Sequence, residues 1–235
     1  MIRCLLHGAG RMGQRLLAQL PEFQNYELAA VVTLPGSEDL AAVDCFGSLA
    51  EVNSDVDLLI DFTLPGGTRS AAHWCGRNGV ALLSGTTGLA DDDLQALRDA
   101  ALKVPVLWAP NLSFGVALTK TLVRQAAESL GVDADVHVSE THHKHKVDAP
   151  SGTAVALAAT VVEGRGEGEP TFSSVRECEI IGEHTVSFSV PGETIEITHK
   201  ALDRDVFAKG ALKAGGWLVG QPPGYYSTGD WLGLG

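Results

Sequence analysis

Residues 142–146, HHKHK, concentrate proton donors and positive charge in a chain that is otherwise acidic. They include three of the eight histidines, and the chain has a formal net charge of −12 at pH 7. A histidine can exchange a proton near neutral pH, and a lysine offers a compact positive charge to carboxylates. This spacing therefore predicts a small cationic pocket that binds an anion and protonates it.

The segment that follows, VDAPSGTA (147–154), predicts the start of a helix beside this pocket. Asp148 and Ser151 are both suitable N-cap residues, and Pro150 disfavours helix before it. A helix is therefore expected to begin near Ser151.

Backbone N–H groups at that helix start would complete an anion site. Gly152 and Thr153 would present unpaired N–H groups, and a glycine leaves room for a carboxylate to reach the backbone. We expect Lys146 to add a charge there, and a neighbouring histidine to hold its proton better beside the bound carboxylates.

Three other interpretations of HHKHK stay open: a solvated basic loop, a nucleic-acid contact and a metal site. The acidic chain argues against nucleic acid. His142, His143 and His145 are too close in sequence to converge easily on a metal, because neighbouring side chains of an extended chain point opposite ways. An active site without a metal is favoured.

A second motif, GAGRMG, places Gly8, Gly10 and Gly13 between a predicted strand and a predicted helix. In a dinucleotide-binding turn the first glycine permits the tight turn, the second admits the pyrophosphate, and the third lets helix and strand pack closely. A plain glycine turn is the alternative. Thr33 stands about 20 residues on, where an acid often binds the ribose, and Arg11 is the nearest cation for a 2′-phosphate. The choice between NADH and NADPH stays open.

The elements that must position these motifs alternate between strand and helix in the first half of the chain. A parallel sheet covered on both faces is expected. The predicted strands are 2–7, 27–33, 57–63, 80–84 and 104–109, and the predicted helices follow the glycine turn and span 67–78 and 91–102. The loops SGTTG (84–88) and APNLS (109–113) would end two strands at a cofactor crevice, or be ordinary turns.

After about residue 112 the pattern changes to an α+β domain. Helices are expected over 118–130, 153–164 and 207–220, a strand over 134–140, and an antiparallel hairpin over 186–190 and 194–198. We expect a dinucleotide-binding domain over 1–112, completed by a C-terminal segment at about 213–235. Residues 113–212 would form a domain for substrate binding and oligomerisation.

Composition limits the setting of the protein. Of its 235 residues 45% are hydrophobic and 20% charged, as in ordinary globular proteins. No apolar run approaches the roughly 18 residues that span a bilayer, and the first residues do not resemble a signal peptide. Cys4, Cys45, Cys75 and Cys178 form no CxxC pair, which favours reduced thiols. A cytoplasmic protein without membrane or nucleic-acid partners is expected.

Together these motifs resemble the 4-hydroxy-tetrahydrodipicolinate reductase (dihydrodipicolinate reductase) family of the diaminopimelate–lysine pathway. The most specific is ETHHKHKVDAPSGTA (140–154). GAGRMG, DFT.P.GT (61–68), SGTTG, APN.S.GV (109–116), GEHTV (182–186) and ITHKA (197–201) follow the family's order, so the resemblance covers nearly the whole chain.

The resemblance implies a role for each matching residue. His142 matches the proton donor and Lys146 the lysine that acts in catalysis and binds a substrate carboxylate. The other implied substrate contacts are His143, Ser151, Gly152 and Thr153. The implied NADH or NADPH contacts are Gly8, Ala9, Gly10, Arg11, Met12, Gly13, Thr33, Phe62, Thr63, Gly85, Thr86, Thr87, Ala109, Pro110, Asn111 and Leu112.

The implied fold is a Rossmann domain joined to a domain with a mixed open sheet that supports a homotetramer. The implied reaction transfers a hydride to a small dicarboxylate. Thr33-Leu34 departs from the acid and base found in some members, so cofactor preference is not carried over. Two alternatives remain: another two-domain nicotinamide dehydrogenase of the aspartate family, and a non-catalytic dinucleotide redox sensor.

Overall fold

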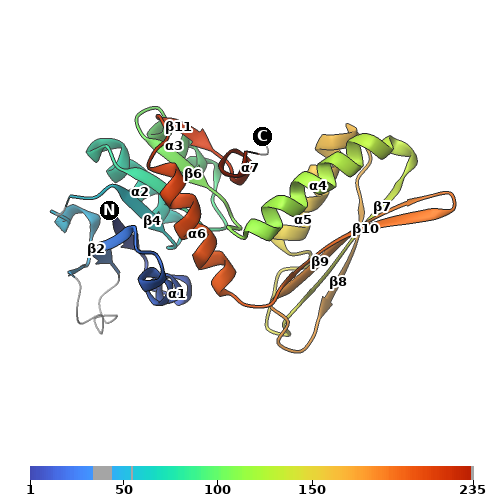
Figure 1. The fold of residues 1–235 in the computed structure, drawn as a ribbon, viewed down its shortest axis with the longest axis horizontal. Helices are drawn as coiled ribbons and strands as arrows, with labels where there is room; N and C mark the ends of the chain where they lie inside the picture. The colour runs from blue at the N-terminus through green and yellow to red at the C-terminus, as the bar shows by residue number, and fades with distance from the viewer. Residues whose placement is uncertain (34–43, 54, 234–235) are drawn as a thin grey trace. The chain divides into compact units, whose positions relative to one another are not determined.

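The computed structural model describes residues 1–33, 44–53 and 55–233 (Figure 1). Contacts divide the chain into two compact units. Unit 1 combines Met1–Leu112 with Phe207–Gly233, and unit 2 is Ser113–Val206. The return to unit 1 thus begins at Phe207, earlier than the expected 213, because the helix α6 (Asp205–Leu218) packs its apolar face on the first sheet.

Unit 1 is built on a seven-stranded sheet in which every printed pairing is parallel. The strand order is β11-β6-β5-β4-β1-β2-β3, and from β3 to β6 this is the order of dinucleotide-binding Rossmann domains. The strands are β1 (Ile2–His7), β2 (Tyr26–Val32), β3 (Cys45–Phe46), β4 (Leu58–Asp61), β5 (Ala81–Ser84), β6 (Pro105–Trp108) and β11 (Gly224–Tyr226). The expected parallel sheet is confirmed; β3 and β11 were not expected, because such short strands show no periodicity.

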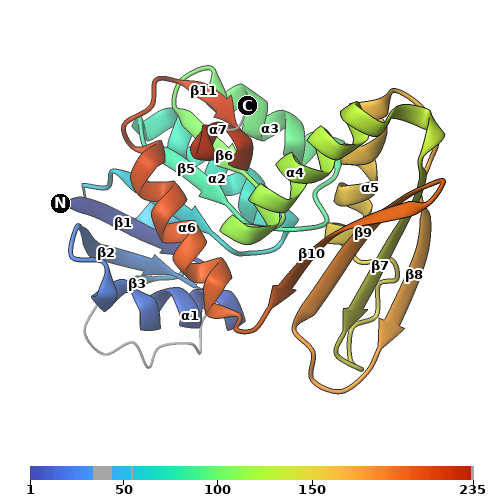
Figure 2. The same cartoon turned by 45° about the vertical axis from the view of Figure 1, so that its right-hand side comes forward.

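Helices lie on both faces of this sheet (Figure 2). Residues of one strand alternate between two cores: Leu6 packs with α1 and α6, whereas Leu5 packs with α2 and α3. The strand order reverses direction beside β1, so the carboxyl ends of β1 and β4 form the crevice where such sheets bind ligands. The helices are α1 (Arg11–Gln19), α2 (Pro65–Asn78), α3 (Asp91–Ala101), α6 (Asp205–Leu218) and α7 (Thr228–Leu232).

Unit 2 has a mixed four-stranded sheet in the order β10-β9-β7-β8. β7 pairs parallel with β8 and antiparallel with β9, which forms the expected hairpin with β10 around Pro191-Gly192. Two helices pack on one face of this sheet. The elements are α4 (Phe114–Leu130), β7 (Asp135–His142), α5 (Gly152–Arg165), β8 (Thr171–Arg176), β9 (Gly182–Val190) and β10 (Glu193–Ala201). The strand β8 was not predicted.

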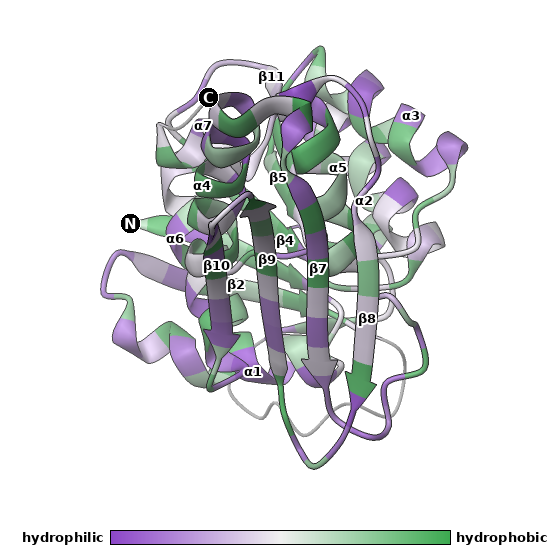
Figure 3. Ribbon diagram, turned by 90° about the vertical axis from the view of Figure 1, so that its right-hand side faces the viewer, coloured by the Kyte–Doolittle hydropathy of each residue, from purple (hydrophilic) through white to green (hydrophobic). Residues whose placement is uncertain are grey.

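Figure 3 views the sheet of unit 2 from the face opposite α4 and α5. That face carries short hydroxyl side chains in cross-strand pairs, such as Thr185 with Thr198 at 2.9 Å. Short 3-10 turns complete the described elements at Leu20–Glu22, Leu49–Glu51 and Gly131–Asp133. None of the helices in the described part of the chain has the length and apolar content needed to cross a membrane.

Candidate active site

The histidine at the end of β7 belongs to the buried face of its strand. Val136, Val138, Glu140 and His142 alternate with more exposed neighbours, so the inward-facing row changes from apolar to ionisable along one strand. Glu140 is 2% exposed and His142 is 7% exposed. Buried groups of this kind need partners, because an unpaired charge is costly away from water.

Glu140 receives hydrogen bonds from three directions. Arg176, at the end of β8, donates to both carboxylate oxygens, at 2.9 and 2.7 Å. Nδ1 of His142 donates to Oε2, and the backbone N–H of Ser151 donates to Oε1 at 3.3 Å. Burial raises the pKa of Glu140, but the hydrogen bonds from Arg176, Ser174 and His142 outweigh it and lower the pKa to about 2. Glu140 is therefore ionised at neutral pH.

The ionised carboxylate fixes the tautomer of His142. With Nδ1 donating to Glu140, the neutral ring keeps its lone pair on Nε2, which is the atom left to gain or lose a proton. Burial lowers the pKa of His142 below 6.5, Glu140 raises it, and Lys146 and Arg176 lower it again, with a net decrease. Bound carboxylates would act in the opposite direction.

A second histidine, His184 on β9, lies opposite Glu140 in the strand register. Its ring meets that of His142 edge-on, with centroids 5.0 Å apart. The hydroxyl of Ser151 forms a hydrogen bond with Nε2 of His184 at 3.0 Å and accepts from the backbone N–H of Ala154 at 3.2 Å. Burial lowers the pKa of His184 to about 4, so this ring stays neutral beside His142.

The helix start predicted at Ser151 is observed. The Ser151 side chain caps α5, which begins at Gly152, whereas Asp148 does not cap it. Burial raises the pKa of Asp148, but Lys146 and the nearby backbone of Gly152 outweigh it and lower the pKa, so the carboxylate lies close to the helix start. Lys146 also pairs with Asp148, at 2.7 Å between Nζ and Oδ1. One side-chain carboxylate thus pairs with Lys146 and lies near Gly152, the two places where we expected a substrate carboxylate to bind.

The remaining residues of the HHKHK segment are nearer to solvent. His143 is half-buried, and its ring centroid lies 6.3 Å from that of the exposed His145. Partial burial and the charge of Arg204 lower the pKa of His143. Thr153, in the first turn of α5, is half-buried, and a Cβ on Gly152 would meet no atom within 4 Å. There is thus room beside the helix start for a small anion.

Among the described residues, the side chains that lie close enough to hold a metal ion are not the three histidines of HHKHK. Ligand atoms of Glu140, His142 and His184 lie within 4.8 Å of one another. Both oxygens of Glu140 already accept from the Arg176 guanidinium, and a fixed positive charge at that place opposes a cation. The donor set therefore suits proton transfer better than metal binding.

The glycine turn of unit 1 has the geometry of a dinucleotide cradle. Gly8 has φ of 99°, and a Cβ there would lie 2.7 Å from the carbonyl oxygen of Phe62. A Cβ on Gly13 would lie 2.1 Å from the Gly8 oxygen, whereas a Cβ on Gly10 would meet nothing within 4 Å. The first turn of α1 has no acidic residue and no side-chain cap, so its N–H groups and positive dipole suit phosphates.

A buried carboxylate that the sequence analysis did not single out supports the neighbouring loops. Asp61, at the end of β4, accepts from the hydroxyls of Thr63, Thr68, Ser84 and Thr86 at 2.6 to 3.0 Å. Burial raises the pKa of Asp61, but the His7 ring, with Nδ1 3.3 Å from the carboxylate, and hydrogen bonds from Thr63 and Thr68 outweigh it and the pKa is lowered. This network ties the ends of β4 and β5 together.

The other residues expected to contact the cofactor all belong to unit 1. Around the crevice, a Cβ on Gly85 would collide with the ring of Phe62 at 2.3 Å, and Trp108 Nε1 donates to the Thr86 oxygen at 2.9 Å. Ala9, Ala109 and Leu112 are buried, Thr33, Phe62, Thr63 and Asn111 are half-buried, and Arg11, Thr87 and Pro110 are exposed. Met12 packs against the core. Leu34 lies outside the described residues.

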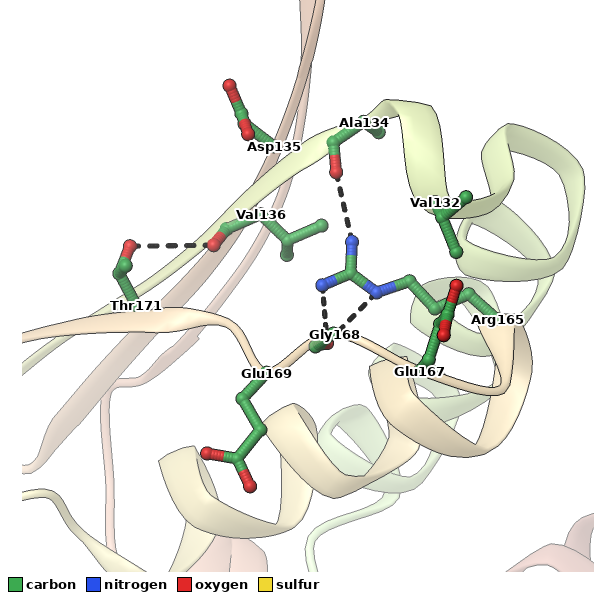
Figure 4. Close-up of a pocket in the computed structure, with 9 residues that line it drawn as sticks. All are labelled: Val132, Ala134, Asp135, Val136, Arg165, Glu167, Gly168, Glu169 and Thr171. Atoms are coloured by element: carbon green, nitrogen blue, oxygen red, sulfur yellow. Dashed lines mark hydrogen bonds between the residues drawn. The ribbon is translucent and has the colours of Figure 1, made fainter.

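A cavity of about 450 Å³ lies at the other end of β7 (Figure 4). Arg165 fills one side of it and donates to the carbonyl oxygens of Ala134, at 2.9 Å, and Gly168, at 3.1 Å. Its guanidinium is therefore occupied by the backbone. The strand separates this cavity from His142 by about 20 Å at 3.3 Å per residue, so the cavity is not part of the candidate site.

Three functional candidates were missed from the sequence. Glu140 could have been found, since it precedes His142 by two positions on a predicted strand and so shares its face. His184 lies in GEHTV, which was noted only as part of the resemblance. Arg176 ends β8, a strand that was not predicted, and no local pattern connects it with Glu140, 36 residues away.

Comparisons with family models, curated proteins and solved structures each find a match to the same family over nearly the whole chain. Family models described as dihydrodipicolinate reductase, N-terminus and C-terminus, match residues 2–112 and 115–232. The 4-hydroxy-tetrahydrodipicolinate reductase of Alkalilimnicola ehrlichii is 41% identical, with 98% of each chain covered. That of Stenotrophomonas maltophilia is 44% identical, again with 98% of each chain covered. A dipicolinate-bound dihydrodipicolinate reductase from Paenisporosarcina sp. TG-14 superposes with a TM-score of 0.82 at 26% identity, covering 97% of this chain and 98% of that one. The chain therefore belongs to the dihydrodipicolinate reductase family.

Proposed function

We propose that this chain reduces 4-hydroxy-tetrahydrodipicolinate to tetrahydrodipicolinate in diaminopimelate and lysine biosynthesis, with His142 as the proton donor. The activity follows from its full-length relatives. The observation that carries the chemical assignment is the buried His142, held through Nδ1 by an ionised Glu140 and close to Lys146 and the start of α5. A non-catalytic dinucleotide sensor would need no such proton donor.

A reduced nicotinamide dinucleotide would bind at the glycine turn. Gly8, Gly10 and the first turn of α1 would hold its pyrophosphate, with the loops at Thr63, Thr86 and Ala109 lining the crevice around it. When bound, the cofactor supplies the hydride. We propose that both NADH and NADPH are accepted, because Thr33 stands where an acid would select the free ribose hydroxyl of NADH, and the exposed Arg11 would be available to a 2′-phosphate.

The substrate carboxylates would bind at Lys146 and the N-terminus of α5. The open space at Gly152 and the positive helix end support this placement. A substrate carboxylate at this place would compete with the Asp148 carboxylate, which pairs with Lys146 at 2.7 Å. His143 and Thr153 would contact the ring or its second carboxylate.

The reaction is balanced by one hydride and one proton. After the 4-hydroxyl leaves as water, the hydride brings two electrons to the unsaturated ring, and the electron-rich carbon or enamine that results takes a proton from Nε2 of His142. One double bond of the ring is lost, and His142 is left neutral, with its remaining proton on Nδ1 and hydrogen-bonded to Glu140. Solvent then restores the Nε2 proton. The charge of Glu140 favours the imidazolium that must form before each turnover.

The test is nicotinamide oxidation, followed by absorbance, with the freshly made pathway intermediate and each cofactor in turn. His142→Gln should lower kcat by about 100-fold or more, the usual contribution of a general acid, while dipicolinate still binds. Lys146→Ala should weaken dipicolinate binding and lower kcat. The matched control is Lys144→Ala, which removes an exposed lysine that pairs with Glu179 at 3.7 Å.

Two results would contradict the assignment. Unchanged turnover in His142→Gln would remove that residue from the mechanism, and intact binding in Lys146→Ala would remove the lysine from the carboxylate site. Turnover of another substrate of the aspartate family, but not of this intermediate, would overturn the proposed reaction itself.

We further propose that the protein is a cytoplasmic homotetramer assembled through the open face of the sheet in unit 2. Among the described residues no helix packs on that face, whose short side chains, such as Thr185 and Thr198, would allow a second sheet to approach. Light scattering should give the mass of four chains. Thr185→Arg should reduce the mass, and an unchanged tetramer in that variant would place the interface elsewhere.

A further inference from the structure

We propose that Arg176 is a positioning residue that, through Glu140, keeps the proton of neutral His142 on Nδ1 and leaves Nε2 to exchange a proton with the substrate. This inference rests on the proposed role of His142. It assigns a function to a residue on β8, which would not itself touch the substrate.

The contact between Arg176 and Glu140 has the geometry of a fixed pair. The guanidinium donates to both carboxylate oxygens, at 2.9 and 2.7 Å, so the carboxylate cannot rotate without losing a hydrogen bond. The Glu140 side chain is 0% exposed and that of Arg176 is 18% exposed. In the strand register Arg176 lies beside His142, so the pairing of β7 with β8 brings the three residues together.

Both carboxylate oxygens of Glu140 therefore have identified hydrogen-bond donors. Oε2 accepts from Arg176 and from Nδ1 of His142, and Oε1 accepts from Arg176 and from the Ser151 N–H. A carboxylate surrounded by donors only accepts, so the ring nitrogen that faces it must carry the proton.

Removing Arg176 would reverse the direction of the hydrogen bond between His142 and Glu140. A fully buried carboxyl group without its cation favours the neutral acid. A protonated Glu140 donates a hydrogen bond. The His142 ring would then accept it at an unprotonated Nδ1 and carry its own proton on Nε2. The neutral ring would then present a proton at the wrong atom and have no anion to stabilise its imidazolium.

Arg176 also connects the two halves of the candidate site. It donates to the carbonyl oxygen of Asp148, whose carboxylate pairs with Lys146. The charged and titratable groups around His142 are Glu140 on its own strand, Arg176 on β8, His184 on β9 and Lys146 in the following loop. Of these only Arg176 contacts both the partner of His142 and the segment that holds Lys146.

The decisive measurement is the tautomer of His142 in the ligand-free full-length protein, from ¹⁵N shifts of the imidazole nitrogens. The signals are assigned by comparison with His142→Gln. The native protein should have its proton on Nδ1, and Arg176→Met should move a large part of the population to Nε2–H. Arg176→Lys keeps the charge without the bidentate contact and should give an intermediate result. Arg124→Met, which breaks an exposed 2.9 Å pair with Glu163, is the control.

Kinetics provide the second readout. Arg176→Met should lower kcat by about 100-fold, as for loss of a general acid, while the dissociation constant for NADH stays unchanged. In Arg176→Ala, added guanidinium chloride should restore at least a tenth of the native kcat, and the same concentration of sodium chloride should not.

An Nδ1–H tautomer that persists in Arg176→Met would overturn the proposal, as would native kcat in that variant. If Arg176→Met does not fold, Arg176→Lys and the rescue of Arg176→Ala decide the question. Because the tautomer is read without substrate, it separates this proposal from the proposed function. A native protein that does not reduce the intermediate would refute the function and leave the tautomer result standing.

Discussion

A Cβ on Gly182 of β9 would lie 3.0 Å from Nε2 of His142. The absence of a side chain at this position therefore keeps open the space beside the atom proposed to transfer the proton. Gly182→Ala should displace the ring by a few tenths of an ångström and lower kcat, by less than the about 100-fold that a displacement of 1 Å can cause. Steady-state kinetics and the NADH dissociation constant test this prediction.

The control for that variant is Ser187→Ala, on the same strand but on its open face. It removes only a 3.3 Å hydrogen bond to Glu196 and should leave kcat unchanged. Native kcat in Gly182→Ala would mean that the Nε2 side of the ring does not need to be fixed.

The pH dependence of the reaction should differ between the free and the substrate-bound protein. Burial lowers the pKa of His142 below 6.5, so the imidazolium of the free protein is lost as pH rises through a value below 6.5. kcat/KM, which reports the free protein, should fall there. Bound carboxylates raise the pKa, so kcat should fall at a higher pH. Rate profiles measured for both parameters check this order, and coincident profiles would contradict it.

Stability should decrease on acidification because of His184. Burial lowers its pKa from 6.5 to about 4, so the unfolded chain takes up a proton at a higher pH than the folded one. The contribution of neutral His184 to the free energy of unfolding is fully present above pH 6.5 and is lost as the pH falls toward 4. Between these pH values it amounts to about 3 kcal/mol. Urea unfolding across this window should show a smaller loss for His184→Gln.

The dependence of the unfolding free energy on pH should be weaker in His184→Gln but not absent, because burial also lowers the pKa values of His142 and His199. His145→Gln, which replaces an exposed histidine, provides the control and should keep the native slope. An equal pH dependence in His184→Gln and the native protein would show that His184 does not cause the loss of stability at low pH.

Two glycines of the dinucleotide turn should respond differently to alanine. A Cβ on Gly13 would lie 2.1 Å from the backbone oxygen of Gly8, so Gly13→Ala should destabilise the protein by about 2 kcal/mol or more. A Cβ on Gly10 meets nothing within 4 Å, so Gly10→Ala should fold normally. It should nevertheless weaken nucleotide binding by about tenfold, or about 1.4 kcal/mol, because the pyrophosphate approaches the backbone there.

Thermal unfolding and fluorescence titration with NADH and NADPH distinguish the two effects. Normal nucleotide binding by a folded Gly10→Ala protein would place the pyrophosphate elsewhere. A similar loss for both cofactors is expected, since the residues described near Thr33 offer no group that selects between them.

The sequence by itself determined the local features of this protein. The period of the apolar residues predicted the principal strands and helices, the glycine spacing predicted the turn before α1, and Ser151 after Pro150 predicted the start of α5. Each of these depends on residues within a few positions of one another, where steric preference and capping act directly.

Only the tertiary structure decided what surrounds the proton donor. Arg176 reaches Glu140 because β8 pairs parallel with β7, and His184 lies beside the His142 ring because β9 pairs antiparallel with β7 on its other edge. The register of strand pairs fixes which distant side chains share a buried face, and no local spacing encodes it. The sequence thus specified a histidine and a lysine in one segment, while strand pairing determined the charge and tautomer of that histidine.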